Sequence, residues 1–278
     1  MNDLQKTEFQ LLRQFSAACE KLNIKYFLLC GSALGAVKYH GFIPWDDDID
    51  VGMFRKDYER FLQAAPKLLP KDVFLQSYKT DNNYFNIFAK LRNSNTAYIE
   101  KTYSKIDINH GVYIDIFPLD GYPLKKSEQN SLERKKLFYK QRLSSLFDNP
   151  NLLKKILKMP LRFITLNPQK TTEKYEKLIS SYDADTSPII CNHGNWQGKL
   201  EYAPAEQYGN GKVAEFEGLA VRVPEKFDEY LTQKYGDWRA ELPKDEQVGH
   251  HFYEVCDLDR PYTDYVEKLA NGKIRIKK

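Results

Sequence analysis

The chain has 278 residues, of which 42% are hydrophobic and 14% aromatic, and this much apolar material excludes an intrinsically disordered protein. The net charge is only +4. That is too weak a charge for nucleic acid to be the expected partner, but it suits an anionic substrate such as a nucleotide diphosphate.

Neither a membrane span nor a secretory signal is expected. No stretch approaches the roughly 20 apolar residues that cross a bilayer, and the first ten residues are too polar for a signal peptide. The cysteines are scattered without paired spacing, at Cys19, Cys30, Cys191 and Cys256. These features predict a reduced, cytoplasmic protein.

The N-terminal part predicts short buried strands between helices. Apolar residues at three- and four-residue intervals predict a helix over 3–22, and a continuous apolar run predicts a buried strand over 26–30. A short helix over 33–37, a strand over 49–53 and a helix over 56–69 follow.

Four further strands are predicted at 73–78, 85–91, 97–100 and 113–117. Residues 127–181 then carry helical periodicity, interrupted by prolines. The C-terminal part returns to mixed character, with strands at 189–191, 213–216 and 219–223 and a helix that Pro224 opens and that runs through Tyr235.

Carboxylates on two predicted strands indicate a magnesium site. Asp48 and Asp50 lie two residues apart, so both side chains point to the same face of a strand. Asp115 stands between apolar neighbours on a separate strand, where an ionised carboxylate is costly unless it is paired or metal-bound. Hard carboxylate oxygens of this kind bind Mg²⁺, which neutralises charge in phosphoryl transfer.

Each feature also has a simpler interpretation. An acidic run is often a solvated loop, and Asp115 could form a salt bridge with an Arg or Lys. A calcium-binding EF-hand loop fails because Val51 stands where that loop needs Gly, and Asp57 where it needs Glu. Gly31 and Ser32 follow the first buried strand, where free N–H groups and a hydroxyl cradle phosphate, although Gly-Ser there is often only a turn.

Several segments resemble the LicD family, which includes bacterial phosphocholine transferases and, more distantly, fukutin and fukutin-related protein. The most specific is Pro-Trp-Asp-Asp-Asp-Ile-Asp within residues 29–53. The other matching segments are 90–100, 111–120, 216–218, 235–238 and 242–250.

The resemblance implies a nucleotidyltransferase fold with a mixed sheet flanked by helices. It also implies transfer of a phospho-group from a CDP-linked donor to a sugar hydroxyl, with release of CMP. Asp48, Asp50 and Asp115 would be the catalytic acids that bind Mg²⁺ or Mn²⁺, with Asp115 also the general base. Gly31 and Ser32 would hold donor phosphate.

On this basis the α/β chain divides into three parts. Residues 1–124 form a nucleotidyltransferase core with the acid triad. Residues 125–185 form a helical insertion, and residues 186–278 an α/β part that completes the catalytic domain.

Cationic side chains are expected to offset the charge of a diphosphate. Lys38, Lys90 and Arg92 are candidates, and Lys90 and Arg92 share one face of a strand; solvated charges on an edge strand are the alternative. The resemblance adds His250 as a substrate-binding candidate. Trp45 could stack on cytosine, but a core position beside the metal loop is favoured.

Two further patterns have competing interpretations. A zinc site can be drawn from Cys191, His193, His251 and Cys256, but the spacing matches no standard finger, which favours two unrelated pairs. Residues 152–164 are basic and amphipathic, so they either lie on an anionic membrane surface or pack over the active site.

The preferred hypothesis is a phosphotransferase that uses CDP-choline or a related CDP-alcohol to modify a glycan or lipid-linked glycan, such as a teichoic-acid precursor. The first alternative is a nucleotidyltransferase that attaches NMP to a small molecule or protein. A non-catalytic glycan-binding protein is the second, although a pure binder has no need of three clustered carboxylates.

Overall fold

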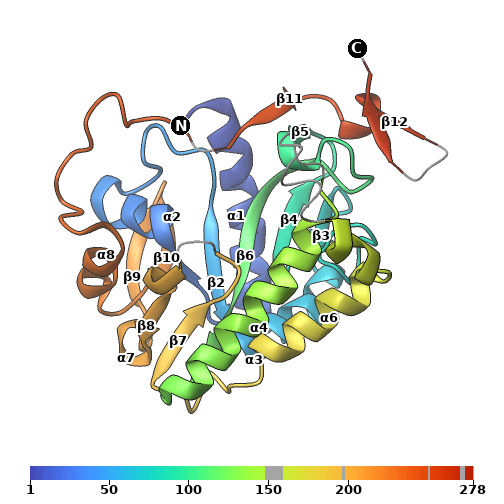
Figure 1. Cartoon of the computed structure of the whole chain (residues 1–278). Coiled ribbons are helices and arrows are strands. Elements are labelled where there is room, and N and C mark those ends of the chain that lie inside the picture. Colours follow the sequence, from blue (N-terminus) through green and yellow to red (C-terminus); the bar gives the residue numbers. More distant parts are fainter. Residues whose placement is uncertain (148–158, 196–197, 250, 270–272, 278) are drawn as a thin grey trace.

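A seven-stranded mixed sheet forms the centre of the molecule, confirming the predicted α/β fold (Figure 1). The computed structural model describes residues 1–147, 159–195, 198–249, 251–269 and 273–277. The strands of this sheet are β1 (Phe27–Leu28), β2 (Asp50–Phe54), β3 (Val73–Gln76), β4 (Ala89–Asn93), β6 (Val112–Gly121), β7 (Ile189–Asn192) and β8 (Tyr202–Pro204). The main path is β1-β2-β6-β4-β3, with β7 paired to β6 and β8 to β7.

Strand β6 organises the sheet. It is parallel to β2 and antiparallel to β4 and β7, and all ten of its residues are buried. Burial on both faces explains why its sequence reads as a nearly continuous apolar run, in which Asp115 is an exception.

Helices cover both faces of the sheet (Figure 1). They are α1 (Asp3–Leu22), α2 (Cys30–Leu34), α3 (Arg55–Ala64), α4 (Lys126–Ser144), α6 (Pro168–Ile179), α7 (Ala205–Tyr208) and α8 (Phe227–Tyr235). Helices α4 and α6, from the predicted helical insertion, lie side by side in front of the sheet, and α1 lies behind it. The division into core, insertion and completing part stays a prediction.

Helix α1 forms as its sequence predicts. Asn2 caps it by accepting a hydrogen bond from the Gln5 backbone N–H at 2.8 Å, while the Gln5 side chain accepts one from the Asn2 N–H. Such a reciprocal cap satisfies two N–H groups that a helix start leaves free. Leu12 and Phe15 in the centre of the apolar stripe are completely buried, and Asn23 ends the helix in the left-handed conformation.

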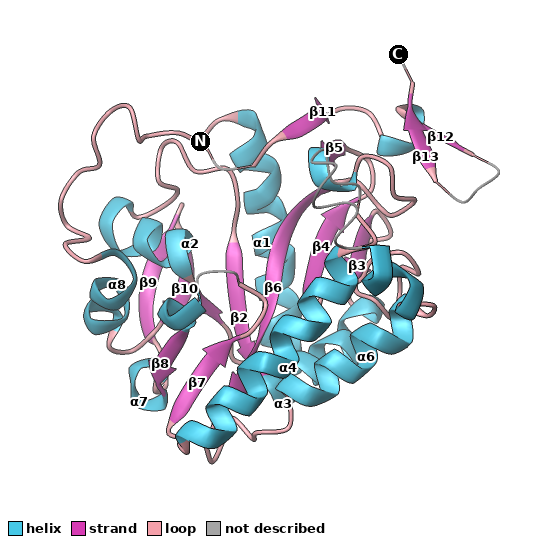
Figure 2. Ribbon diagram, viewed as in Figure 1, coloured by secondary structure: helices cyan, strands magenta, loops and turns pink. Residues whose placement is uncertain are grey.

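Three small two-stranded sheets lie outside the centre (Figure 2). They are β9 (Lys212–Phe216) with β10 (Leu219–Val223), β5 (Ala97–Glu100) with β11 (Tyr253–Asp257), and β12 (Val266–Lys268) with β13 (Ile274–Ile276). The first pairs two predicted strands as a hairpin. Its turn, Glu217-Gly218, has positive φ at both residues, as a tight right-twisted hairpin requires.

Some predicted boundaries were wrong. The strand expected over 85–91 is β4 at Ala89–Asn93, and the helix expected over 56–69 ends at Ala64, followed by a 3₁₀ turn that contains Pro66. Strands β11, β12 and β13 were not predicted.

Candidate active site

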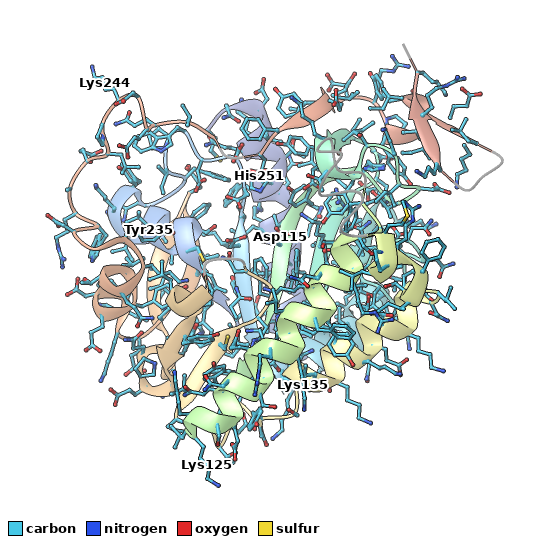
Figure 3. The ribbon with its side chains drawn as sticks, viewed as in Figure 1. Asp115, Lys125, Lys135, Tyr235, Lys244 and His251 are labelled. Carbon is cyan, nitrogen blue, oxygen red and sulfur yellow. The ribbon has the colours of Figure 1, made fainter. Side chains whose placement is uncertain are left out.

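A cavity of about 560 Å³ lies beside the start of β2, and its walls have two characters. One wall is acidic and is formed by Asp46, Asp48, Asp50, Glu100 and Asp115. Many aromatic rings also line the cavity, namely Tyr39, Trp45, Phe88, Tyr103, Phe117, Tyr235 and Trp238. Figure 3 labels Asp115, Tyr235 and His251, which lie around this region of the molecule.

Strand register brings two of the predicted acids together. Asp50 on β2 pairs with Asp115 on the parallel strand β6, and Asp115 pairs in turn with Lys90 on β4. Paired residues of neighbouring strands project to the same face, so the three side chains form a row across the sheet. The Asp115 N–H donates to Ile49 O at 2.8 Å, which fixes this register next to the acidic loop.

The acidic loop before β2 is held by helix α1. The Gln5 side-chain amide donates to the carbonyl oxygen of Asp46 at 2.9 Å. The Asp46 side chain also packs closely against the backbone of Gly31. A Cβ atom on Gly31 would stand only 2.8 Å from Asp46 Oδ2. Gly31 lines the cavity, where its missing side chain leaves room for this carboxylate.

Ser32 has a different contact from the predicted one. Its Oγ accepts a hydrogen bond from the Asp50 backbone N–H at 2.8 Å, and the residue is buried outside the cavity lining. The hydroxyl therefore holds the first residue of β2 in place. Of the two residues predicted to hold donor phosphate, only Gly31 lines the cavity.

The clustered carboxylates are electrostatically unfavourable without a cation. Burial raises the pKa of Asp50, and the charges of Asp48 and Asp115 raise it further. Burial and neighbouring acids likewise raise the pKa of Asp46 to about 8. A cation placed between these groups would relieve the repulsion and restore their ionised forms.

Lys90 provides part of the positive charge. Its Nζ lies 2.9 Å from Asp115 Oδ1, 3.9 Å from Glu100 Oε2 and 3.2 Å from the centroid of the Tyr113 ring. Burial raises the pKa of Asp115, and Lys90 partly offsets that rise. Lys90 lines the cavity, as a phosphate-contacting cation must.

Arg92 lies behind this row. It is completely buried, and its guanidinium donates to Gln76 Oε1, Gly111 O and Glu100 Oε2 at 2.6, 2.7 and 3.3 Å. It does not line the cavity. The prediction that Arg92 contacts phosphate does not fit these contacts, and we assign it to orienting Glu100.

His251 is a site residue that the sequence analysis did not select. Its Nδ1 lies 3.0 Å from Asp47 Oδ1, its backbone N–H donates to Asp47 Oδ2 at 3.0 Å, and its Nε2 lies 3.9 Å from Asp48 Oδ2. Burial alone would lower the pKa of His251, but the hydrogen bond to Asp47 and the charge of Asp48 raise it to about 9. The selected neighbour, His250, lies outside the described residues.

A metal ion fits this corner of the cavity. Ligand atoms of Asp47, Asp48 and His251 all lie within 4.8 Å of one another. This group shares only Asp48 with the predicted set of Asp48, Asp50 and Asp115. Because Asp48 belongs to both sets, the observed group and the predicted group lie in one acidic pocket. The carboxylates of this pocket outnumber its cationic side chains, which favours binding of a metal ion.

The remaining candidates are placed as follows. Lys38 lines the cavity, donates to Ala240 O at 2.9 Å and pairs with Glu241 Oε1 at 3.0 Å. Trp45 also lines it, next to Tyr39 at 6.3 Å between ring centroids. The four residues considered for a zinc site do not come together. Cys191 Sγ lies 3.3 Å from His193 Nδ1, whereas Cys256 pairs with Tyr98 across β11 and β5 and His251 contacts Asp47.

The sequence is similar to those of known proteins. Residues 23–149 match the family described as LicD/FKTN/FKRP, nucleotidyltransferase domain. The chain is 31% identical over 265 residues to the lipopolysaccharide cholinephosphotransferase LicD of Haemophilus influenzae, covering 89% of this chain and 94% of that protein. It is also 31% identical over 128 residues to an uncharacterised protein of Rickettsia typhi, covering 45% of this chain and 40% of that protein. The resemblance seen in the motifs thus extends over nearly the whole length of the Haemophilus protein, and the chain belongs to the LicD family.

Proposed function

We propose that this protein is a transferase that moves a phospho-alcohol, with phosphocholine as the first choice, from a CDP-linked donor to a hydroxyl of a cell-surface glycan. The observation that carries the proposal is the row of Asp50, Asp115 and Lys90 in a cavity with an acidic wall, in a LicD-family chain. The Haemophilus relative is named for transfer of phosphocholine to lipopolysaccharide. Lipopolysaccharide or a teichoic-acid precursor would suit as acceptor here.

The proposed reaction is an in-line displacement at phosphorus. The acceptor hydroxyl oxygen attacks the choline-bearing phosphorus of the donor, the bond from that phosphorus to the bridging oxygen breaks, and CMP leaves with that oxygen. A phosphodiester links choline to the glycan in the product. The hydroxyl proton passes to Asp115, whose burial raises its pKa and so makes it a better proton acceptor than an exposed aspartate.

Mg²⁺ or Mn²⁺, held by Asp48 with Asp50 and Asp115 or with Asp47 and His251, would neutralise charge on the transferring phosphoryl group. Lysine side chains of the protein would neutralise the remaining negative charge of the donor. Lys90 lies beside Asp115 on the cavity wall, and Lys38 lies on the same cavity next to the aromatic residues. Gly31 lines the same cavity and is assigned to donor phosphate.

A thermal-shift screen tests the donor class. Purified protein with Mg²⁺ is heated with CDP-choline, CDP-ethanolamine, CDP-glycerol, CDP-ribitol, CMP or NTPs. A ligand that binds only the folded state raises the melting temperature. Stabilisation by one CDP-alcohol that is lost in Asp48→Ala supports the proposal, whereas stabilisation by an NTP alone favours transfer of NMP instead.

We also propose peripheral contact with a membrane at the inner face, where a lipid-linked acceptor would be presented. No helix in the described ranges has the length and apolar character to span a bilayer. Residues 152–158 of the amphipathic segment lie outside those ranges. Large apolar side chains next to them are exposed rather than packed over the cavity, namely Met159, Phe163, Ile164 and Leu166. Vesicle flotation of wild type against Phe163→Ser tests the contact, and equal flotation of both would contradict it.

A further inference from the structure

A second cavity, of about 500 Å³, adjoins the catalytic one. It lies between the segment before β4 and the helices α4 and α6. The two cavities share wall residues, which are Phe88, Glu100, Tyr103 and Gly194. A molecule bound in the second cavity would therefore lie next to the acidic wall of the first, within reach of Glu100.

Two residues that line this second cavity each have a buried polar atom with no hydrogen-bond partner among the described residues. These atoms are Nε2 of His193 and the hydroxyl oxygen of Tyr175, and both residues are buried. Leaving such a group buried and unpaired costs about 1–3 kcal/mol, so native proteins rarely keep two together without a ligand or water for them.

The hydrogen-bonding role of His193 can be assigned. Its Nδ1 faces the thiol of Cys191 at 3.3 Å. Burial raises the pKa of that thiol, which therefore keeps its proton and donates it to Nδ1. The imidazole is neutral because burial also lowers its pKa, so its proton is on Nε2. Nε2–H is thus an unused donor, and the Tyr175 hydroxyl can donate or accept.

The other walls of the cavity are largely aromatic and apolar. Phe85, Phe88, Tyr103 and Phe147 all line it, and the rings of Tyr103 and Phe147 meet edge to face with centroids 5.4 Å apart. Flat apolar walls with a few hydrogen-bonding groups are suited to a sugar ring, which presents C–H faces and a rim of hydroxyls.

We infer that this second cavity binds a sugar ring of the acceptor and presents its neighbouring hydroxyl to the catalytic cavity. A sugar satisfies both His193 and Tyr175, whereas a quaternary ammonium group forms no hydrogen bonds and would leave both unpaired. Lys140 also lines the cavity and disfavours a cation. The cavity is therefore assigned to the acceptor rather than to choline, and its part in the reaction rests on the proposed function.

Direct binding measurements test the assignment without any donor. Methyl glycosides of glucose, galactose and N-acetylgalactosamine are titrated into the full chain and followed by ligand-observed NMR. The wild type is expected to bind at least one of them. Tyr175→Phe removes only the hydroxyl and should weaken that binding about fivefold to tenfold, the effect of losing one hydrogen bond.

The matched control is Tyr139→Phe. Tyr139 stacks on Tyr175 with ring centroids 5.7 Å apart but does not line the cavity, so its loss should leave sugar binding unchanged. Thr102→Trp changes an exposed residue at the cavity wall and should block binding without affecting the fold. Absence of binding to all three glycosides, or equal binding by wild type and Thr102→Trp, would overturn the inference.

Failure of the proposed function has a different signature. If glycosides bind as expected but no CDP-alcohol raises the melting temperature, the sugar site stands and the donor class is wrong. If a CDP-alcohol binds and is hydrolysed by water at the same rate in wild type and Thr102→Trp, while no glycoside binds, the donor site stands and the sugar site is wrong.

Discussion

At the scale of single residues, the site depends on which side chains the strand register brings into one row. Asp50 and Asp115 are 65 positions apart in sequence yet paired on neighbouring parallel strands, with Lys90 paired to Asp115 from the other side. The sequence shows that Asp48 and Asp50 stand two residues apart and that Asp115 interrupts an apolar run, so these three acids could be selected as candidates. The pairing itself depends on contacts between distant segments.

The acid row predicts separate effects on turnover and stability. Asp50→Asn and Asp115→Asn should each lower turnover by about a hundredfold or more, because each removes a catalytic carboxylate. The melting temperature of Asp50→Asn should stay level or rise, since one of several mutually repelling buried charges is lost. Asp115→Asn also removes the ion-pair partner of the buried Lys90, so its melting temperature should fall. Thermal melts and a CMP-release assay measure both quantities. Asp259→Asn, an exposed aspartate, is the control, and full turnover by either site variant would refute the assignment.

The Asp47–His251 pair predicts an effect on metal affinity. Removing a carboxylate that orients a metal-binding imidazole typically weakens metal affinity by about 10–100-fold. His251→Gln and Asp47→Asn should therefore weaken Mn²⁺ binding by roughly tenfold or more, as titrated by electron paramagnetic resonance. Unchanged Mn²⁺ affinity in both variants would remove His251 from the metal site.

His110 predicts a loss of stability in acid. It is buried, its Nε2 lies 2.9 Å from Ile106 O, and burial lowers its pKa to about 4. An unfolded histidine titrates near pH 6.5, so the stabilisation from keeping His110 neutral is present above about pH 6.5 and is lost as the pH falls through 4. At pH 4 the loss is about 3 kcal/mol.

The matching experiment compares wild type with His110→Gln by urea unfolding at several pH values. The variant should lose less unfolding free energy between about pH 7 and pH 4. The active-site carboxylates have raised pKa values and shift stability in the opposite direction, but they are common to both proteins and cancel in the comparison. Parallel pH profiles would show that His110 is not kept neutral by the fold.

At the scale of elements, a buried ionic network ties the sheet to the helices of the predicted insertion. Arg55, at the start of α3, donates from Nε and Nη2 to the two oxygens of Asp120 on β6, both at 2.7 Å. Its Nη1 donates to Glu176 Oε1 on α6 at 3.2 Å. Three elements therefore share one guanidinium, and Glu176 also accepts a hydrogen bond from Tyr78.

Breaking this network should be costly because Asp120 is completely buried. Arg55→Ala leaves that carboxylate without its partner and should lower the unfolding free energy by roughly 3–5 kcal/mol. Lys56→Ala removes the neighbouring exposed cation, which pairs with Asp183 and Asp185, and should cost much less because solvent screens exposed ion pairs. Equal effects of the two substitutions in urea titrations would contradict this account of the network.

Local patterns predicted some elements well and others poorly. Helix α1 and strand β6 have strong periodicity or a continuous apolar run, and both are where the sequence indicates. The segment before β4 is equally apolar but bends into the cavity walls, so the predicted strand began too early. Strand β11 was missed because its partner, β5, lies more than 150 positions earlier and its residues are only partly buried.

The candidate site shows the same division. Gly31, Lys38, Lys90 and the three acids line one cavity as the motifs suggested, but Ser32 and Arg92 do not, because a sequence does not reveal burial depth. His251 comes from a C-terminal loop that returns to Asp47. His250, the neighbour that the sequence analysis selected, lies outside the described residues, so its assignment stays a prediction.

At the scale of the whole molecule, the two adjoining cavities suggest a division of labour. The catalytic cavity combines the acids with Lys38, Tyr39 and Trp45, where a charged nucleotide donor would fit. The second cavity uses the helices α4 and α6. Donor chemistry would then depend on the strands that carry the acids, and acceptor choice on these two helices.

The central claim is that the phospho-alcohol, not the nucleotide, is transferred to a glycan. The most direct measurement is ³¹P NMR of the products formed from CDP-choline, Mg²⁺ and an acceptor glycan, with Asp50→Asn as the inactive control. The account predicts stoichiometric CMP and a new phosphodiester that carries choline on the sugar. Appearance of CMP joined to the acceptor, with phosphocholine released, would contradict it.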